Sequence, residues 1–308
     1  MASSTHDVRR SDRAFKRGLQ VAAWAILALF GALFWFLFMS AKPAFDAFGW
    51  QFYVTKVWNP VLDQYGALAF MWGTLVSSLL ALVIAVPVSV GAALYLTELA
   101  PRPLRAPVGF LIEMLAAIPS VVYGIWGIFV LAPFLRKWVQ PFLSEHLGFI
   151  PLFEGAPFGL GMMTAGIILA IMITPTITAI TREVFRSIPD LLREGALALG
   201  ATRWEMLRIA VLKTGAAGIL GATVLGLGRA MGETMAVAMV IGNRADISLS
   251  LLKPGATMAS VIANEYAEAG SDMHLAALTA VGLGLFFVSL IVNSAARAII
   301  WRVERTGS

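Results

Sequence analysis

Long stretches without a charged residue constrain the fold of this chain more than any other feature of its sequence. Four stretches contain no Asp, Glu, Lys or Arg, and two further apolar stretches contain internal charges, Glu113 in one and Arg229 with Glu233 in the other. A helix that spans the hydrocarbon core of a bilayer needs about 20 mainly apolar residues. We therefore predict an all-α polytopic membrane protein with about six transmembrane helices, at residues 18–41, 64–97, 106–135, 155–181, 214–243 and 273–296.

The composition supports a membrane location and excludes several classes of site. Hydrophobic residues make up 59% of the chain and charged residues 13%, whereas soluble domains are about half apolar and about a quarter charged. The chain has no cysteine, which excludes a disulfide framework, a thiolate metal site and a cysteine nucleophile. Its three histidines are far apart, so we expect no metal site and no cofactor in this chain. Because the basic residues form short clusters between apolar stretches, we expect no nucleic-acid partner.

The distribution of Lys and Arg predicts the orientation of the helices. Cytoplasmic loops of membrane proteins carry an excess of these two residues. With a cytoplasmic N-terminus and six crossings, 16 of the 23 basic residues lie inside, six lie outside and Arg229 lies in the membrane. We therefore expect both termini in the cytoplasm. A secretory signal peptide is an alternative for the first stretch, but the apolar run at 19–39 is longer than a typical signal core, which favours a retained helix.

The basic segment between the fourth and fifth stretches has the pattern of two short amphipathic helices. Pro189 and Asp190 fit a first helical turn, where proline is tolerated and an acidic side chain faces the positive helix end. Gly200 is placed to end that helix, and Thr202 with Glu205 forms a T-x-x-E capping box for the next one. On this pattern alone, an interfacial helix on anionic lipid is an alternative to a docking segment for another protein.

Arg229 and Glu233 lie near the middle of the fifth stretch. A charge inside the bilayer costs at least ~2.5 kcal/mol on insertion scales, so it usually marks function or a paired site. Their spacing places both side chains on one face of a continuous helix. The pair either neutralises itself and fixes helix packing, or provides an anion site, because the planar Arg fork matches phosphate oxygens. Gly228 and Gly232 form a G-x-x-x-G pattern that allows close helix approach. These glycines do not form a Walker A loop, so we do not expect the chain to bind ATP itself.

A short pattern in the basic segment resembles the cytoplasmic loop of ABC-importer permeases. The matching residues are Glu194, Gly195, Ala196 and Gly200. In that family the loop is a coupling helix that docks into a cleft of the ATPase subunit. The resemblance implies the same role for these residues and for the adjacent Arg193. The family often continues with Ile-x-Leu-Pro, whereas residues 210–213 of this chain lack that Ile and Pro.

Three longer strings resemble the C-type permease of the phosphate-specific transport system, the PstC family. They are GRAMGETMAVAMVIGN at 228–243, FLIEMLAAIPSVVYGIWG at 110–127 and YLTELAP at 95–101. The related A-type permease usually has Ala-Pro after G-E-T, whereas Met235 and Ala236 follow here. The resemblance covers about residues 66–300.

The resemblance implies a type I ABC importer permease fold in a bacterial inner membrane and a subunit that is not itself an enzyme. It implies a heterodimer with an A-type permease, a dimer of ATPase subunits that binds ATP and Mg²⁺, and an external phosphate-binding protein. The implied substrate path includes Arg229, Glu233, Thr234 and Glu113, with Glu113 as an alternative partner of Arg229. Helix packing is expected at Gly228, Gly232 and Pro119. Pro119, inside the third stretch, is also expected to bend or break its helix. Alternatives are a permease for another oxyanion, such as sulfate or molybdate, and a secondary anion transporter.

The expected organisation has four parts. A cytoplasmic tail at 1–18 precedes the first transmembrane helix and an external loop at 19–65. The permease transmembrane domain follows at 66–300 and includes a cytoplasmic coupling segment at 183–213. A cytoplasmic tail at 301–308 ends the chain.

Overall fold

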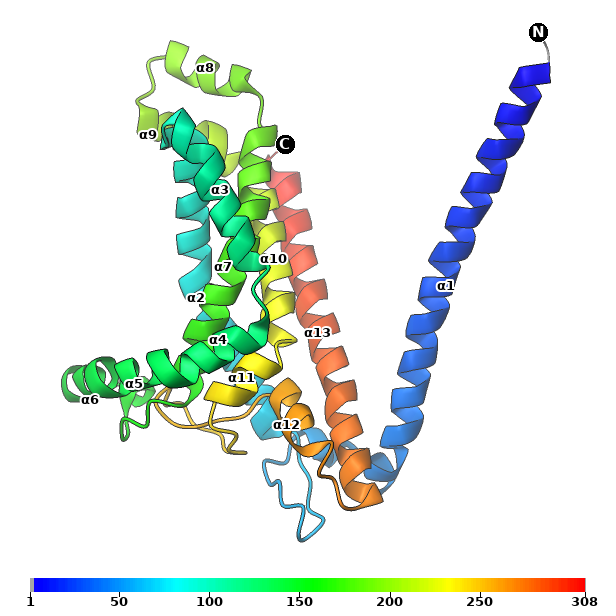
Figure 1. The fold of residues 1–308 in the computed structure, drawn as a ribbon, viewed down its shortest axis with the longest axis vertical. Coiled ribbons are helices and arrows are strands. Elements are labelled where there is room, and N and C mark those ends of the chain that lie inside the picture. Colours follow the sequence, from blue (N-terminus) through cyan, green and yellow to red (C-terminus); the bar gives the residue numbers. More distant parts are fainter. Residues whose placement is uncertain (1–2, 308) are drawn as a thin grey trace.

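The computed structural model describes residues 3–307, with side chains for residues 15–302 and 305. The described part is helical over most of its length and contains no strand, which confirms the expected all-α class (Figure 1). The helices run between an end that carries α8 and an opposite end that carries α12. We refer to these as the α8 end and the α12 end. The helices are α1 (Ser3–Phe48), α2 (Leu68–Leu94), α3 (Arg102–Ala116), α4 (Ser120–Trp126), α5 (Ala132–Phe134), α6 (Gln140–Leu147), α7 (Met162–Ser187), α8 (Asp190–Ala198), α9 (Arg203–Met206), α10 (Ala216–Met231), α11 (Met235–Val240), α12 (Met258–Glu265) and α13 (Asp272–Gly307).

Five helical segments of the described chain are long and apolar enough to cross a bilayer. They are Phe15–Tyr53, Leu68–Leu99, Ser120–Leu147, Met162–Ser187 and Asp272–Arg302. A sixth is obtained if two helices that meet at a 62° bend, Arg203–Lys213 and Ala216–Met231, form one crossing. The expectation of about six spans is therefore met in number, although two of the expected spans differ in structure.

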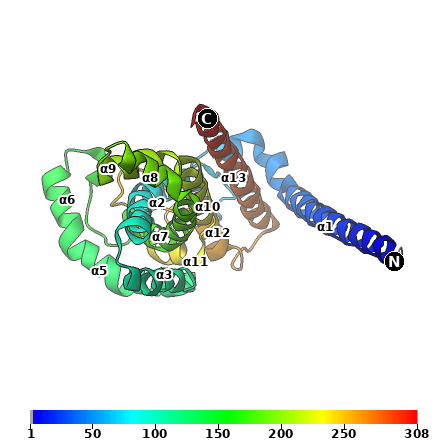
Figure 2. The ribbon, with the colours of Figure 1, turned by 90° about the horizontal axis from the view of Figure 1, so that it is seen from above.

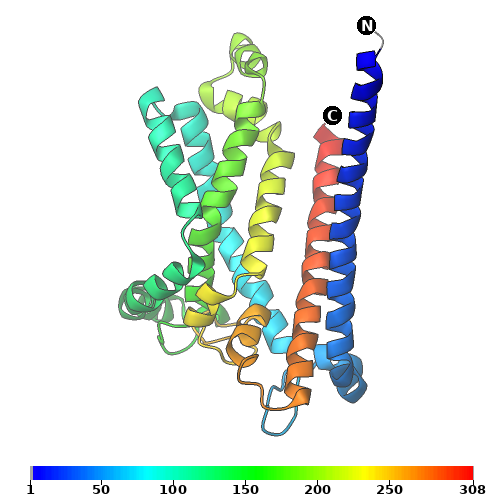
Figure 3. The same ribbon diagram turned by 45° about the vertical axis from the view of Figure 1, so that its right-hand side comes forward.

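Helix α7 forms the centre of the bundle, with α2 and α10 packed along it (Figure 3). Its most apolar window is 67% buried within the chain, whereas the corresponding window of α1 is 0% buried. Glycines bring the helices close together: a Cβ on Gly166 would lie 2.4 Å from Cδ2 of Leu80, and one on Gly226 would lie 2.6 Å from Cδ1 of Ile177. Such close van der Waals contacts hold helices together in lipid, where apolar surface gains nothing from leaving water.

Helices α1 and α13 form a pair at the side of this bundle, where α13 also packs against α10. They meet at the α12 end and diverge toward the α8 end (Figures 1 and 2). A second buried cluster joins the pair to α2 and α12, with Phe52, Phe70, Met258 and Leu278 among its members. The two ends of the described chain both lie at the α8 end (Figure 1). A chain that crosses the membrane an even number of times has both of its ends on the same side, as here.

The third expected span, at 106–135, is not one helix, because it breaks at Pro119 as expected from the proline. Helix α3 ends at Ala116, and α4 begins after Pro119, whose backbone is extended at φ −58° and ψ 139°. Proline has no N–H to continue the ladder and disfavours helical conformation in the residue before it. Beyond the break, α4, α5 and α6 run across the α12 end instead of continuing the line of α3 (Figures 1 and 3).

The fifth expected span is also interrupted, so the continuous helix expected over 214–243 is wrong. Helix α10 ends at Met231, and α11 begins at Met235. Gly232, a poor helix former, starts the break, and the Glu233 carboxylate then accepts a hydrogen bond from the backbone N–H of Ala236 at 3.3 Å. This bond satisfies one of the unpaired donors in the first turn of α11.

Candidate functional site

The two helix breaks lie on neighbouring elements. Helix α4, which follows the first break, packs against α11, which follows the second. A Cβ on Gly124 of α4 would lie only 2.6 Å from Sδ of Met239 and 3.2 Å from Cα of Ala236 in α11. Non-helical backbone at membrane depth is tolerated where protein buries it or where it lines a water-filled cavity. The paired breaks therefore mark the part of the bundle best suited to a polar site.

Arg229 lies in the last turn of α10, beside the second break. Its side chain is half-buried, and Nη1 donates a hydrogen bond to Oγ1 of Thr176 in α7 at 3.0 Å. Within the part of the chain with described side chains, no carboxylate lies within ion-pair distance of this guanidinium. A half-buried cation held by a neutral hydroxyl keeps most of its donors for an anion.

Glu233 does not pair with Arg229, because the helix ends between them and the expected one-turn spacing is lost. Its carboxylate accepts the backbone N–H of Ala236 instead. Thr234, the residue before α11, is also half-buried, and its hydroxyl donates to the carbonyl of Gly232 at 3.2 Å. Arg229, Glu233 and Thr234 are therefore close in the chain and border the same break, but they do not bond to one another.

Glu113 takes no part in this group, and the expectation that it is an alternative partner of Arg229 is wrong in this structure. It lies on α3 and accepts a hydrogen bond from Nη2 of Arg182 on α7 at 2.5 Å. The Arg182 side chain is 10% exposed and that of Glu113 is 53% exposed. Gly109 makes room for this arginine, since a Cβ there would lie 2.1 Å from Nη1 of Arg182. The pair joins α3 to α7.

Gly228 and Gly232 do not bring helices together within this chain. A Cβ on Gly228 would meet no atom within 4 Å, and one on Gly232 would meet only the Gly228 carbonyl oxygen at 3.5 Å. The close approach of α10 to α7 uses Gly226 and Gly218 instead; a Cβ on Gly218 would lie 2.5 Å from Val184. Pro119 likewise forms the helix break rather than a packing contact inside a helix.

The segment around α8 has the two-helix form expected from the sequence. Gly200 adopts φ +86° after α8, a backbone conformation that favours glycine. The capping box is present: the Glu205 N–H donates to Oγ1 of Thr202 at 3.3 Å, and the Thr202 N–H donates to Oε2 of Glu205 at 2.7 Å. Glu194 and Gly195 are exposed, and Ala196 is half-buried. The apolar side chains of this segment are also exposed, at Leu191, Leu192, Leu197 and Leu199.

Arg193 points into the protein, unlike its exposed neighbours on α8. Its guanidinium donates to Oε1 of Glu98 through Nη2 at 2.9 Å and through Nε at 3.2 Å. It also donates to the carbonyls of Phe185 at 2.7 Å and Ile188 at 2.6 Å, and to the carboxylate of Asp190 at 3.0 Å. The two main partners are both sheltered, with side chains 15% exposed for Arg193 and 12% for Glu98. Arg193 therefore fixes α8 to the ends of α2 and α7.

The comparisons with known proteins decide the family. Residues 85–305 match the family model of the binding-protein-dependent transport system inner membrane component. The phosphate transport system permease protein PstC of Mesorhizobium japonicum is 46% identical over 303 residues, which cover 97% of this chain and 93% of that protein. The chain belongs to the PstC permease family. The protein of the same name from Pasteurella multocida is also 46% identical, over 94% of this chain and 92% of that protein.

Solved structures support the fold of this PstC family member. The bacterial alginate ABC transporter, in complex with an alginate-bound periplasmic protein, contains a chain similar to this one at a TM-score of 0.64. The two are 18% identical, and the match covers 97% of each chain. The MetNI methionine ABC transporter in an inward-facing conformation gives a TM-score of 0.52 over 77% of this chain and 94% of the matched chain, at 18% identity.

Several residues of this PstC family member become candidates only through the structure. Thr176 is uncharged and lies inside an apolar stretch, so only its bond to Arg229 singles it out. Arg182 directly follows a charge-free stretch, and nothing in the sequence indicates that its side chain is nearly buried. Glu98 lies inside a family string, but its partner Arg193 is 95 residues away in the sequence. No spacing rule connects residues so far apart.

Proposed function

We propose that this chain is the permease subunit of an ATP-driven phosphate importer and forms part of the path of phosphate across the inner membrane. The observation that carries the proposal is Arg229, a half-buried cation beside two helix breaks in a chain of the PstC family. An anion that crosses ~30 Å of hydrocarbon needs positive charge on its path. The relatives' name, phosphate transport system permease, supplies the substrate.

The chemistry of the Arg229 site fits a protonated oxyanion. The guanidinium offers charge-assisted hydrogen bonds in a planar fork that matches phosphate oxygens. Glu233 borders the same break and accepts a hydrogen bond. Near neutral pH phosphate carries a proton that it can donate to such a carboxylate, whereas sulfate carries none. In this proposal Glu233 distinguishes phosphate from sulfate.

The proposal includes three partners. An A-type permease completes the path as the second half of a heterodimer, and an external phosphate-binding protein delivers the substrate. A dimer of ATPase subunits binds ATP and Mg²⁺ and hydrolyses the nucleotide. The surface formed by α8 and the turn after it, with Glu194, Gly195, Ala196 and Gly200, docks the ATPase, while Arg193 holds α8 in place from within. In this arrangement the α8 end is cytoplasmic.

Transport by the reconstituted complex tests the substrate and the energy source together. Phosphate uptake into vesicles is expected to need ATP, with arsenate as a strong competitor and sulfate as a weak one. A secondary anion transporter would accumulate phosphate on an ion gradient without ATP and would copurify with no ATPase. Stronger competition by sulfate or molybdate than by arsenate would assign the permease to another oxyanion.

The orientation is tested by labelling single cysteines, which the cysteine-free chain makes simple. An impermeant thiol reagent added outside intact cells is expected to modify cysteines at Ser144 and Ser248 of the α12 end. Cysteines at Ser3 and Ser187 of the α8 end should react only after the cells are opened. External labelling at Ser187 would reverse the proposed orientation. The C-terminal Ser308, which is expected to be cytoplasmic, lies outside the described residues.

The docking role of α8 is tested at Gly200. No atom lies within 4 Å of a Cβ built on this residue, so a side chain there causes no clash, but its positive φ disfavours any L-residue. Gly200→Val should leave the chain inserted while it changes the angle between α8 and α9. We expect ATPase association, measured by copurification, to fall about tenfold. Gly195→Val is the matched control, because a Cβ there also meets no atom within 4 Å but the backbone φ is not positive. It distinguishes loss of backbone geometry from loss of surface contact. Wild-type association and transport by Gly200→Val would contradict the docking assignment.

A further inference from the structure

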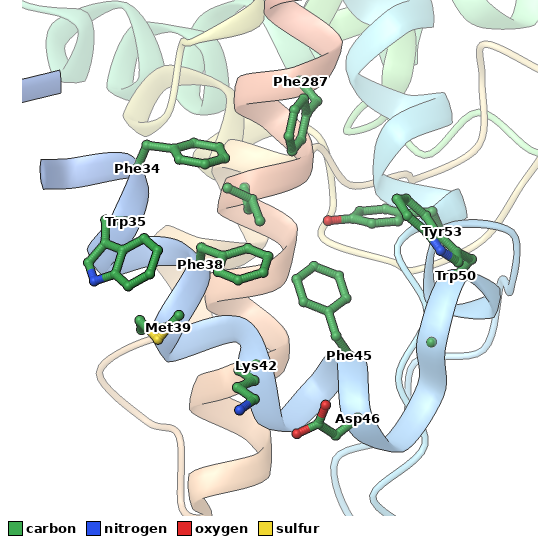
Figure 4. A pocket seen from close by; sticks show the side chains of 12 residues that line it. Phe34, Trp35, Phe38, Met39, Lys42, Phe45, Asp46, Trp50, Tyr53 and Phe287 are labelled. Atoms are coloured by element: carbon green, nitrogen blue, oxygen red, sulfur yellow. The ribbon is translucent and has the colours of Figure 1, made fainter. Parts of the chain in front are cut away.

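A pocket of about 600 Å³ opens between α1 and α13 at the α12 end, away from the Arg229 site (Figure 4). A ladder of aromatic rings lines it from one helix to the other. Phe287 meets Phe34 at 5.9 Å between ring centroids, Phe34 meets Phe38 at 6.5 Å, Phe38 meets Phe45 at 6.3 Å, and Phe45 meets Tyr53 at 6.1 Å. The ladder forms one apolar wall along the length of the pocket.

The base of this pocket is fixed by contacts between the two helices. The hydroxyl of Tyr53 donates a hydrogen bond to the carbonyl of Ala280 at 3.0 Å. The Tyr53 ring also packs directly on the α13 backbone, since a Cβ on Gly284 would lie 2.7 Å from Cε1 of the ring. Phe38 and Phe287 nevertheless remain 40% and 42% exposed. The pocket is therefore a preformed groove that is open to its surroundings.

Two opposite charges border this apolar groove. Lys42 and Asp46 lie one helical turn apart on α1, both exposed, and both line the pocket (Figure 4). Within the part of the chain with described side chains, neither forms an ion pair or a side-chain hydrogen bond with the protein. Lys42 is the first charge after the apolar run of α1, so the rim lies where hydrocarbon gives way to headgroups. The exposed indole of Trp50 lines the same rim, as expected at that depth.

We propose that this groove binds one phospholipid whose headgroup carries both a phosphodiester and a primary ammonium, as in phosphatidylethanolamine. An acyl chain lies along the rings from Phe45 to Phe287. The phosphodiester binds the Lys42 ammonium, and the headgroup ammonium binds the Asp46 carboxylate. The groove has an apolar wall for the acyl chain and one charge of each sign at its rim for the headgroup, so its chemistry matches that of this lipid. An apolar helix of a partner permease would leave both charges without partners.

The test compares lipid retention by the purified complex in detergent, measured by native mass spectrometry with phosphatidylethanolamine and phosphatidylglycerol of the same acyl chains. The wild type is expected to retain phosphatidylethanolamine at least fivefold better. Asp46→Lys makes the rim doubly cationic and should reverse the preference toward anionic phosphatidylglycerol. Glu268→Lys makes the same charge change at an exposed site of the same end and should leave the preference unchanged. An unchanged preference in Asp46→Lys would overturn the proposal.

A second measurement distinguishes lipid from a protein occupant. A fluorophore attached to a single cysteine at Met39, inside the pocket, should be quenched by phosphatidylethanolamine with brominated acyl chains. The quenching should saturate at a lower lipid fraction than for the same fluorophore at Leu33, which is exposed on α1 but does not line the pocket. Equal quenching at the two positions, or a crosslink from Met39 to the partner permease in place of quenching, would show that no lipid occupies the groove.

Discussion

Phosphate uptake by the Arg229→Gln variant is expected to fall at least about 100-fold, while the assembled complex is retained. A charge-assisted hydrogen bond contributes about 1.5–3 kcal/mol, and the fork of Arg229 supplies two of them to a bound oxyanion. Each 1.4 kcal/mol corresponds to a factor of ten. The measurement is ATP-driven uptake of labelled phosphate by reconstituted vesicles, with copurification of the partners as the check on assembly.

Three further variants separate the roles of charge and geometry at this site. Arg229→Lys retains the charge but loses the planar fork and should recover uptake only in part. Thr176→Val removes the hydroxyl that holds Nη1 at 3.0 Å and should have a milder effect than either. Glu233→Gln should reduce the preference for phosphate over sulfate if the carboxylate accepts a hydrogen bond from the protonated phosphate. Near-normal uptake by a correctly assembled Arg229→Gln variant would leave this arginine only a packing role.

The second large effect is expected at the contact between Arg193 and Glu98. Arg193→Ala leaves the sheltered Glu98 carboxylate and the carbonyls of Phe185 and Ile188 without their donor. Removing one partner of a buried ion pair typically costs about 3–5 kcal/mol. Since the guanidinium joins α8 to α2 and α7, we expect uptake to fall at least tenfold while ATP hydrolysis by the complex falls less. The measurement is the number of ATP molecules hydrolysed per phosphate transported.

A matched control for Arg193 is present on the same end of the molecule. Arg186 pairs with Glu183 at 3.0 Å, but both side chains are at least half exposed. Exposed pairs of this kind contribute about 0–1 kcal/mol, so Arg186→Ala should transport like the parent. Arg193→Lys restores one charge without the five-donor fork and is expected to recover coupling only in part. If Arg193→Ala and Arg186→Ala behave alike, Arg193 does not position the coupling segment.

The parts of this structure that could be predicted from sequence depend on local rules. Gly200, the Thr202–Glu205 capping box and the start of α8 at Asp190 all have the form that their residue types favour. Pro119 likewise breaks the third stretch, as a proline inside a helix favours. In contrast, the break after Met231 lies inside a stretch that is apolar on both sides. Apolar composition indicates that a segment can lie in lipid, but it does not indicate whether the segment is one continuous helix.

The arrangement of the charged residues could not be predicted for a different reason. The i,i+4 rule for Arg229 and Glu233 holds only in an unbroken helix, and α10 ends between them. Glu113 meets Arg182, 69 residues later, and Glu98 meets Arg193 across 95 residues. These contacts depend on how α2, α3 and α7 pack, which no local pattern in one sequence encodes.

Helix α7 carries three side-chain contacts along its length, so it can transmit motion from one end of the molecule to the other. At its α8 end, the carbonyl of Phe185 accepts a hydrogen bond from Arg193, and so does the carbonyl of Ile188, which directly follows the helix. One turn earlier Arg182 binds Glu113, and further along Thr176 holds Arg229. At 1.5 Å per residue, Thr176 and Phe185 are only about 14 Å apart on one rigid rod. A small axial shift or rotation of this rod would displace all three contacts together, so the position of α8 and the position of the Arg229 guanidinium are mechanically linked through α7.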